Sequence, residues 1–353
     1  MAVEGNIPST TAQFKIGLQS AKGTPATTSF LCPTVTDSYL RPAFDVIDKG
    51  PEHGCNVTAD RATARRSESR RSSYMVNAGL TMAAYPRTIP ALLAALGFAI
   101  ATSNETTYYE HVATIATRPN WPWVTCMHDI GSKVLRGSDM RASQLTFNAD
   151  QNGLTFDATF MGLVLGNAAG TETHTAETSW ELLPSAGSIS IQLDPDGTPV
   201  EIANIGASQL ARSLSITFDN PLDEAQQTLF SFGRADLPPQ GLGVSGSVGG
   251  LDVDWAVYNQ IVNGAAAGTA PSANQAIASL DLTFESPENI DGAAVPYSMQ
   301  IEIPYMQISL DDSNFQASGD NLISWAFNWE MIDMSTTPIT ITTHNDHASY
   351  AHA

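Results

Sequence analysis

The fold class follows from two runs that lie side by side in the chain, Ser143-Gln144-Leu145-Thr146-Phe147-Asn148 and Leu154-Thr155-Phe156-Asp157-Ala158-Thr159-Phe160. In both runs apolar and polar residues alternate, which is typical of a β-strand with one buried face and one polar face. Asn152-Gly153 lies between them and is a strong signal for a tight hairpin turn. This stretch therefore predicts an antiparallel β-hairpin.

The same alternation returns along most of the chain. It is found at residues 12–18, 108–114, 123–128, 188–193, 199–202, 214–218, 279–284, 297–303, 305–310 and 323–329. Helical pattern is scarce, and the two best candidates are Thr88 to Leu96 and Asp254 to Val262, the second followed by Asn263-Gly264. We therefore predict a mainly β protein with two short helices.

The two predicted helices indicate an internal repeat. A candidate hairpin precedes each of them, Arg70 to Ala83 in one half and Gly241 to Val253 in the other, and several strands follow each. The opening strands, residues 12–18 and 212–218, also correspond loosely. The predicted division is a first β-rich unit at 1–165, a connector carrying its own hairpin at 166–210, a second unit at 211–334, and a strand-like arm or loose tail at 335–353.

The net charge of the 353-residue chain is −20, and only 15% of its residues are charged. The charge is uneven: residues 1–142 carry 14 basic and 11 acidic side chains, whereas residues 143–353 carry Arg212 and Arg234 against 25 acids. Such a balance argues against a nucleic-acid binder that works by neutralising phosphates. An acidic, lysine-poor composition is also typical of proteins adapted to salty water, and that explanation of the charge stays open.

Five arginines in the first half fall within 11 residues. They are Arg61, Arg65, Arg66, Arg70 and Arg71. Such a run is either a solvated face or a surface that docks on an acidic patch of a neighbouring copy. We select these five residues as the candidate contact with a neighbouring copy of the chain.

Targeting and metal signals are weak. The most apolar window, residues 89–101, is too short to cross a bilayer, and the first residues have neither the basic nor the apolar region of a signal peptide. Cys32, Cys55 and Cys126 lack the spacing of a disulfide framework or a zinc site. We expect synthesis in a cytoplasm and no membrane partner.

Motifs that carry chemistry are scarce too, and each has a plainer explanation. Gly241 to Gly246 matches GxGxxG but lacks the flanking strand and helix of a dinucleotide site. Further weak candidates are a Cys126/His128 pair, a metal site at His344, His347 and His352, and carboxylate pairs at Asp252/Asp254 and Asp311/Asp312. We therefore expect no enzyme activity, no cofactor and no metal, and a structural or binding role.

Three stretches, in this order, resemble one protein family. They are Phe14 to Thr27, which contains Lys22-Gly23-Thr24-Pro25-Ala26, then Ala211 to Asn220, then Gly246 to Gly264 with its strand followed by a short helix. The succession is similar to the tail tube (major tail) proteins of phages with long, non-contractile tails. The connector at 166–210 and the His-rich end depart from the family pattern.

The resemblance implies tandem β-sandwich or barrel units, each with a short helix. It further implies a virion structural protein that self-assembles into stacked rings, with a β-barrel of inner hairpins around a lumen that conducts the genome. The candidate lumen hairpins are 70–83 and 241–253, and the loop at 43–70 would reach the neighbouring ring. If one chain supplies two units, a homotrimeric ring with pseudo-six-fold symmetry is preferred over a homohexamer.

The other implied partners are tail proteins (tape measure, tail terminator and distal tail) and double-stranded DNA in transit without specific binding. The implied location is the virion tail, after synthesis in the host bacterial cytoplasm. Two alternatives stay open. One is another virion β-protein, for decoration or the baseplate. The other is a carbohydrate-binding β-sandwich that would use Trp121, Trp123, Trp255, Trp325 and Trp329 as sugar platforms.

Overall fold

The computed structural model describes most of the chain. The described residues are 12–27, 30–49, 68–115, 121–131, 133–150, 153–168, 174–193, 200–204, 211–223, 232–252, 255–265, 267–273, 276–310, 324–334 and 337–350. The fold is mainly β with two short helices, as the alternating sequence pattern predicts. No helix in these ranges is long and apolar enough to cross a membrane.

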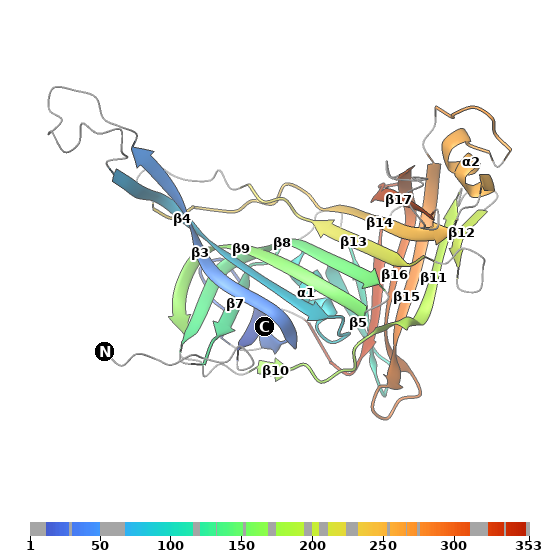
Figure 1. The fold of residues 1–353 in the computed structure, drawn as a ribbon. Coiled ribbons are helices and arrows are strands. Elements are labelled where there is room, and N and C mark those ends of the chain that lie inside the picture. The colour runs from blue at the N-terminus through green and yellow to red at the C-terminus, as the bar shows by residue number, and fades with distance from the viewer. Residues whose placement is uncertain are drawn as a thin grey trace, which may run out of the picture.

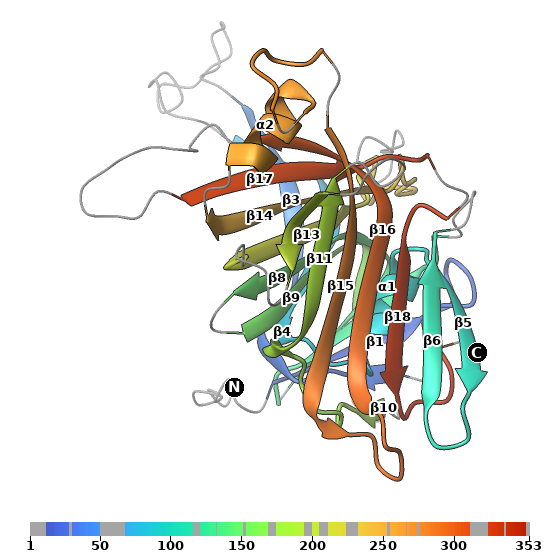
Figure 2. The same cartoon turned by 90° about the vertical axis from the view of Figure 1, so that its right-hand side faces the viewer.

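Seven antiparallel strands form one long layer, which Figure 2 shows with its strands running across the page. In spatial order they are β3 (Val35–Lys49), β4 (Glu68–Ala83), β9 (Gly153–Ala168), β8 (Val134–Asp150), β13 (Ser213–Asp219), β14 (Gly243–Asp252) and β17 (Ser324–Met331). The β3–β4 hairpin projects beyond its neighbours (Figure 1).

A second layer crosses the first at a large angle, and its strands run vertically in Figure 2. In spatial order they are β12 (Val200–Asn204), β11 (Leu183–Leu193), β15 (Ala276–Asn289), β16 (Pro296–Leu310), β18 (Thr340–Asn345), β6 (Tyr109–Thr114) and β5 (Ala99–Asn104). Residues 306–310 of β16 also pair with β17, so this strand belongs to both layers.

Four shorter strands continue from the first part of β8. They are β7 (Val124–Asp129), β1 (Gln13–Leu18), β2 (Phe30–Cys32) and β10 (His174–Ala176). The helices are α1 (Ile89–Ala95), which is buried along its whole length, and α2 (Trp255–Asn263), which buries only Val257 and Ile261. Both lie within two residues of the ranges predicted from sequence.

A single apolar core fills the space between the crossing layers. Phe147 on β8 contacts Phe156 on β9 and Phe284 on β15, with ring centroids 4.9 and 5.3 Å apart. Fully burying one such side chain contributes roughly 1.5–3 kcal/mol. The core therefore depends on the alternate residues of each strand that the sequence pattern marks as apolar.

Several predicted boundaries are wrong. The two candidate hairpins, Arg70 to Ala83 and Gly241 to Val253, are not hairpins, because their described residues belong mainly to the single strands β4 and β14. The true hairpins are β3–β4 and β13–β14. The predicted loop at 43–70 is shorter than expected, since 43–49 and 68–70 are strand.

Two glycines inside these strands have a packing role. Gly79 lies in β4 and Gly246 lies in β14. A Cβ at Gly79 would lie 2.6 Å from the Tyr39 ring, and a Cβ at Gly246 would lie 2.1 Å from the Ser215 carbonyl oxygen. These glycines therefore permit close packing rather than chain reversal.

The strand order repeats within the chain. In the first half the neighbours are β2, β1, β7, β8, β9, β4 and β3, and in the second half they are β12, β11, β15, β16, β17, β14 and β13. When the seven strands of each half are numbered along the chain, the two halves show the same spatial order of strands. Every pairing within each half is antiparallel, and a helix follows both β4 and β14. The counterpart of β1 is therefore β11, within the predicted connector, and not the strand at 212–218.

Candidate functional site

The outward face of the long layer carries two neighbouring rows of polar residues. One row of paired residues crosses eight strands: Gln307, Glu330, Ser245, Thr217, Thr146, Asp157, Thr81 and Asp37. The row beside it reads Ser309, Asn328, Ser247, Ser215, Asn148 and Thr155. Residues that alternate with these, such as Ile216 and Phe147, are buried in the core. We call this surface the polar face.

Neighbouring side chains on the polar face bond one another. Thr81 donates a hydrogen bond from Oγ1 to Oδ1 of Asp157 at 2.5 Å, and Asn148 donates from Nδ2 to Oδ2 of the same carboxylate at 3.4 Å. The hydroxyls of Thr146 and Thr217 are 3.5 Å apart across the β8–β13 pair. The surface thus consists of short side chains with little freedom to extend toward a ligand.

The charges on the polar face are mainly negative. Carboxylates come from Asp37, Asp157, Asp219 and Glu330, and a cation, Arg41, lies on β3 with its guanidinium carbon 5.0 Å from the Tyr39 ring. A face rich in carboxylates repels phosphate groups, and a shortage of Lys and Arg removes the counterion release that drives nucleic-acid binding. Such a face is therefore unsuited to holding nucleic acid by its phosphates.

Strand β3 and its counterpart β13 differ in the number of strands that they pair with. In the described part of the chain, β3 pairs with β4 along one side and with no strand along the other, so its 15 residues form an edge. Its counterpart β13 uses both sides, pairing with β14 and with residues 144–149 of β8. A long unpaired edge invites pairing with another chain.

The predicted arginine cluster is described only in part. Arg61, Arg65 and Arg66 lie outside the described residues, and for Arg70 the structure gives the backbone position opposite Ile47 in the β3–β4 pair. Arg71 is exposed, and its guanidinium carbon lies 3.8 Å from the centre of the Phe44 ring. The described members of the cluster therefore lie at the projecting end of the hairpin.

The Cys126/His128 pair is not arranged as a nucleophile and base. Cys126 is fully buried, and burial raises the pKa of its thiol far above the usual range. His128 Nε2 lies 3.3 Å from the Ser38 hydroxyl, and burial lowers the pKa of its imidazole. A thiol held neutral in an apolar core does not attack a substrate.

The remaining weak motifs are placed in structural surroundings. Residues 243–246 of the GxGxxG match are part of β14, as in the plainer interpretation. His344 bonds Ser298 and Glu110 across the second layer, at 3.0 and 3.1 Å. Among the residues that the structure describes, no group of three or more His, Cys, Asp or Glu could hold a metal ion. His352, Asp254, Asp311 and Asp312 lie outside those residues, as does the side chain of Asp252.

The tryptophans of the carbohydrate alternative lie in different surroundings. Trp329 is buried in the core, and Trp123 lies between the Lys22 ammonium, at 5.2 Å, and the Arg141 guanidinium, at 4.1 Å. Trp255 is exposed on α2, and the side chain of Trp325 lies outside the described residues. Core packing and cation–π contacts account for Trp329 and Trp123.

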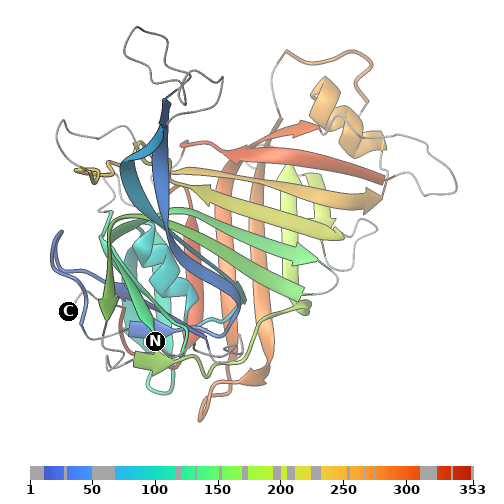
Figure 3. The same cartoon turned by 60° about the vertical axis from the view of Figure 1, so that its left-hand side comes forward.

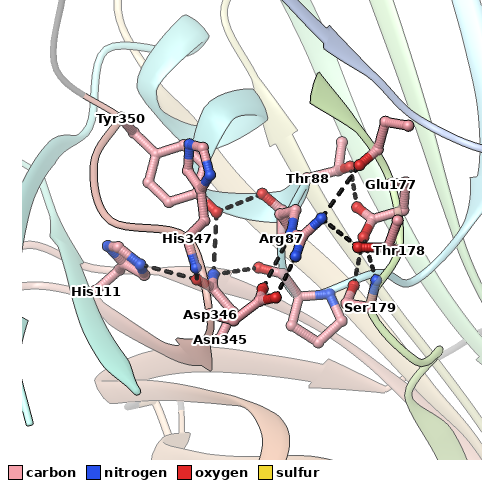
Figure 4. Close-up of polar contacts among 12 residues, drawn as sticks. Arg87, Thr88, His111, Glu177, Thr178, Ser179, Asn345, Asp346, His347 and Tyr350 are labelled. Atoms are coloured by element: carbon pink, nitrogen blue, oxygen red, sulfur yellow. Dashed lines mark hydrogen bonds and ion pairs between the residues drawn. The ribbon is translucent and has the colours of Figure 1, made fainter. Parts of the chain in front are cut away.

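A polar network holds the last described residues against the start of α1 (Figure 4). Arg87 is almost buried and donates from Nε to Asp346 Oδ1 at 3.0 Å and from Nη1 to the Ala176 carbonyl at 3.1 Å. Burial acts to lower the pKa of Arg87, but the hydrogen bond and charge of Asp346 outweigh it, so the pKa is raised. Arg87 therefore stays charged and joins three distant segments.

The buried amide of Asn345 extends this network. Its Nδ2 donates to the Pro86 carbonyl at 2.9 Å, and its Oδ1 accepts from His111 Nε2 at 3.1 Å and from the backbone of His347 at 2.7 Å. The Tyr350 hydroxyl donates to the Arg87 carbonyl at 2.5 Å. Part of the segment predicted as an arm or loose tail thus packs into the body of the protein.

We predict that Arg87→Met lowers the free energy of unfolding by about 2–3 kcal/mol, because it leaves Asp346 and nearby carbonyls without their partner. The value is below that of a fully buried pair because the Asp346 side chain is one third exposed. Lys22→Met is the control: the Lys22–Asp236 pair is exposed, and its loss should cost less than about 1 kcal/mol. Urea unfolding measures both, and equal effects would contradict the prediction.

Sequence reasoning missed the polar face. Its signal was present in the polar positions of each alternating run, which are Ser, Thr, Asn, Gln and Asp rather than Lys or Glu. What the sequence did not supply was the register that brings those positions into continuous rows across strands far apart in the chain.

These features define a class: a mainly β structural protein with a large polar face, an unpaired edge strand and no catalytic cluster among the described residues. A comparison with protein families identifies it further. Residues 57–331, more than three quarters of the chain, match the family described as phage tail tube protein. The chain belongs to this family, which is structural and not enzymatic, and is therefore a component of the phage tail. No curated protein matches the chain.

Proposed function

We propose that this chain forms rings that stack into the tail tube, and that the polar face lines the lumen through which double-stranded DNA leaves. The row from Gln307 to Asp37 carries the proposal, since it extends one polar surface over eight strands. Short hydroxyl and carboxylate side chains repel or ignore phosphates, which favours passage over binding.

Each chain supplies two tube units in this proposal. The repeated strand order supports it, and it moves the boundaries from those predicted by sequence: the first unit spans about 13–168 and the second about 183–331. The β11–β12 hairpin, assigned by sequence to a connector at 166–210, then becomes the opening hairpin of the second unit. The segment after 335 adds β18 between β6 and β16.

The contact between the two units supplies a template for the ring. In the long layer, β3, β4, β9 and β8 belong to the first unit, and β13, β14 and β17 belong to the second. Inside one chain, β13 pairs with β8 where the two units meet. By the same rule, β3 of one copy pairs with the end of β16 in the next copy. This end begins after Ile308, the last residue of β16 that pairs with β15. Three copies then close a barrel with pseudo-six-fold symmetry, and no edge remains.

The arginine cluster belongs to a contact between stacked rings in this proposal. The projecting end of the β3–β4 hairpin, with Arg70 and Arg71, reaches toward an acidic strip on the second unit of the adjacent ring. The second part of the chain is strongly acidic, which supplies the complementary charge. The tape measure, terminator and distal tail proteins bind the finished tube, which is made in the host cytoplasm.

End-on electron micrographs of assembled tubes test the ring. We expect class averages with true three-fold symmetry, in which six similar units alternate between two types. True six-fold symmetry would instead support a homohexamer with one chain per unit. Failure of the purified protein to form any ring or tube, alone or with other tail proteins, would contradict the proposed function.

A further inference from the structure

The β3–β4 hairpin projects from the body of the protein (Figure 3), and it carries exposed aromatic residues. Phe44 on β3, Tyr74 on β4 and Phe232 form a series, with ring centroids 6.4 and 5.2 Å apart. Phe44 is 36% exposed and Phe232 is 48% exposed. Large apolar side chains that remain exposed together mark an interaction surface.

The strand register shows which side of the layer Phe44 and Tyr74 occupy. Phe44 pairs with Tyr74, and the pairs two and four residues along the hairpin are Pro42 with Val76 and Leu40 with Ala78. Leu40, Val76 and Ala78 are buried in the core. Tyr74 packs on the edge of this chain's own core, and Phe44 continues the core-facing side of the hairpin beyond it.

The counterpart strand β13 shows what such a surface does when it has a neighbour. Its core-facing residues Leu214, Ile216 and Phe218 are all buried. Phe218 contacts Phe98, which follows α1 in the first unit, with ring centroids 5.8 Å apart and the rings edge to face. In the contact inside the chain, the opening strand of one unit thus closes the core of the unit before it.

In the described part of the second unit, a rim of partly exposed apolar residues lies at the corresponding place. Ala276 at the start of β15, Leu310 at the end of β16 and Met331 at the end of β17 pack on the core but stay partly exposed. Leu310 pairs with Phe327, which is fully buried, so this rim leads directly into the core.

We infer, on the basis of the ring proposed above, that Phe44 and Tyr74 of one copy pack on the rim formed by Ala276, Leu310 and Met331 of the next copy. The partner that covers these residues is then a second copy of this chain. The contact continues the core from copy to copy around the ring, as Phe218 and Phe98 continue it from unit to unit within one chain.

Site-specific photocrosslinking tests the contact. Phe44 is replaced by p-benzoyl-phenylalanine, and copies labelled with ¹⁴N and ¹⁵N are mixed before assembly, so that crosslinks between copies carry both labels. We expect mixed-label crosslinks from position 44 to peptides that contain Ala276, Leu310 or Met331. The same probe at Trp180, which is also exposed, is the control and should not reach these peptides.

Rings that form normally and whose crosslinks from position 44 stay within one copy, or reach other peptides, would overturn this inference and leave the ring intact. Absence of rings from the unmodified protein would instead overturn the proposed function. If the probe at position 44 itself blocks assembly, a second measurement tests the contact. Phe44→Ser should reduce ring yield at least tenfold at unchanged melting temperature, whereas Phe44→Leu should assemble; wild-type yield from the serine variant would also reject the contact.

Discussion

Tubes assembled from a chain with Ser215→Lys, Thr217→Lys and Ser245→Lys should retain double-stranded DNA that wild-type tubes release. The three residues are neighbours on β13 and β14 in the polar face. Each added ammonium that meets a phosphate releases counterions, and 6–10 such contacts make binding fall about 10³–10⁵-fold between 50 and 200 mM salt. We therefore expect retention at 50 mM salt that is lost at 200 mM.

A control variant tests whether DNA retention depends on where the lysines are placed or only on the added charge. The control carries Gln300→Lys, Thr340→Lys and Thr342→Lys on the outward face of the second layer, where Gln300 pairs with Thr342. Both variants should bind DNA, but only DNA inside the tube resists added nuclease. Nuclease-sensitive DNA on the polar-face variant, or protected DNA on the control, would show that the polar face does not line the lumen.

Tubes should not form when Arg65, Arg66, Arg70 and Arg71 are all replaced by Glu. The change replaces four positive charges with four negative ones, and the contact proposed above would bring them against the strongly acidic second part of the chain. Like charges brought together at an interface cost several kcal/mol, enough to reduce assembly more than a hundredfold. Electron microscopy counts the tubes, and circular dichroism and the melting temperature report the fold.

A matched change of charge elsewhere controls this experiment. Lys133→Glu with Arg136→Glu reverses two charges at the start of β8, away from the hairpin end, and should leave assembly unchanged. Raising the salt concentration should leave assembly of that control unchanged. In the four-arginine variant it should weaken the repulsion and partly restore assembly. Normal tube formation by the four-arginine variant would exclude the cluster from the contact between rings.

The sequence was a good guide to the strands and a poor one to their partners. Alternation located β8, β9, β13 and β15 because one face of each is buried in the core, and burial imposes a period of two. It carries no information on which strands pair. The β8–β13 contact joins residues about 70 positions apart, and no local pattern in either strand indicates it.

One long strand was predicted as two. The runs at 297–303 and 305–310 both belong to β16, with Pro304 between them. Proline lacks an N–H and is tolerated in a strand where no neighbour needs that donor. Pro304 lies between the part of β16 that pairs with β18, up to Glu302, and the part that pairs with β17, from Met306.

The candidate site was predictable only as a composition. The shortage of Lys and Arg after residue 142 indicated a surface that does not hold phosphates. The rows of the polar face depend on register, which is fixed by the packing of residues such as Phe147 and Ile216 behind them. Since that packing joins both halves of the chain, a reading of either half alone could not find it.

The position of β18 has a consequence for the order of events during synthesis. This strand, at residues 340–345, fills the space between β6 and β16, and Asn345 and Tyr350 then fasten it beside α1. Before the ribosome has made these residues, β6 and part of β16 both lack a neighbour. A growing chain therefore cannot complete its outer layer early, and the finished subunit appears only when translation has passed residue 350. Polymerisation that needs the complete subunit is in this way delayed until residues 340–350 have been made and have packed in place.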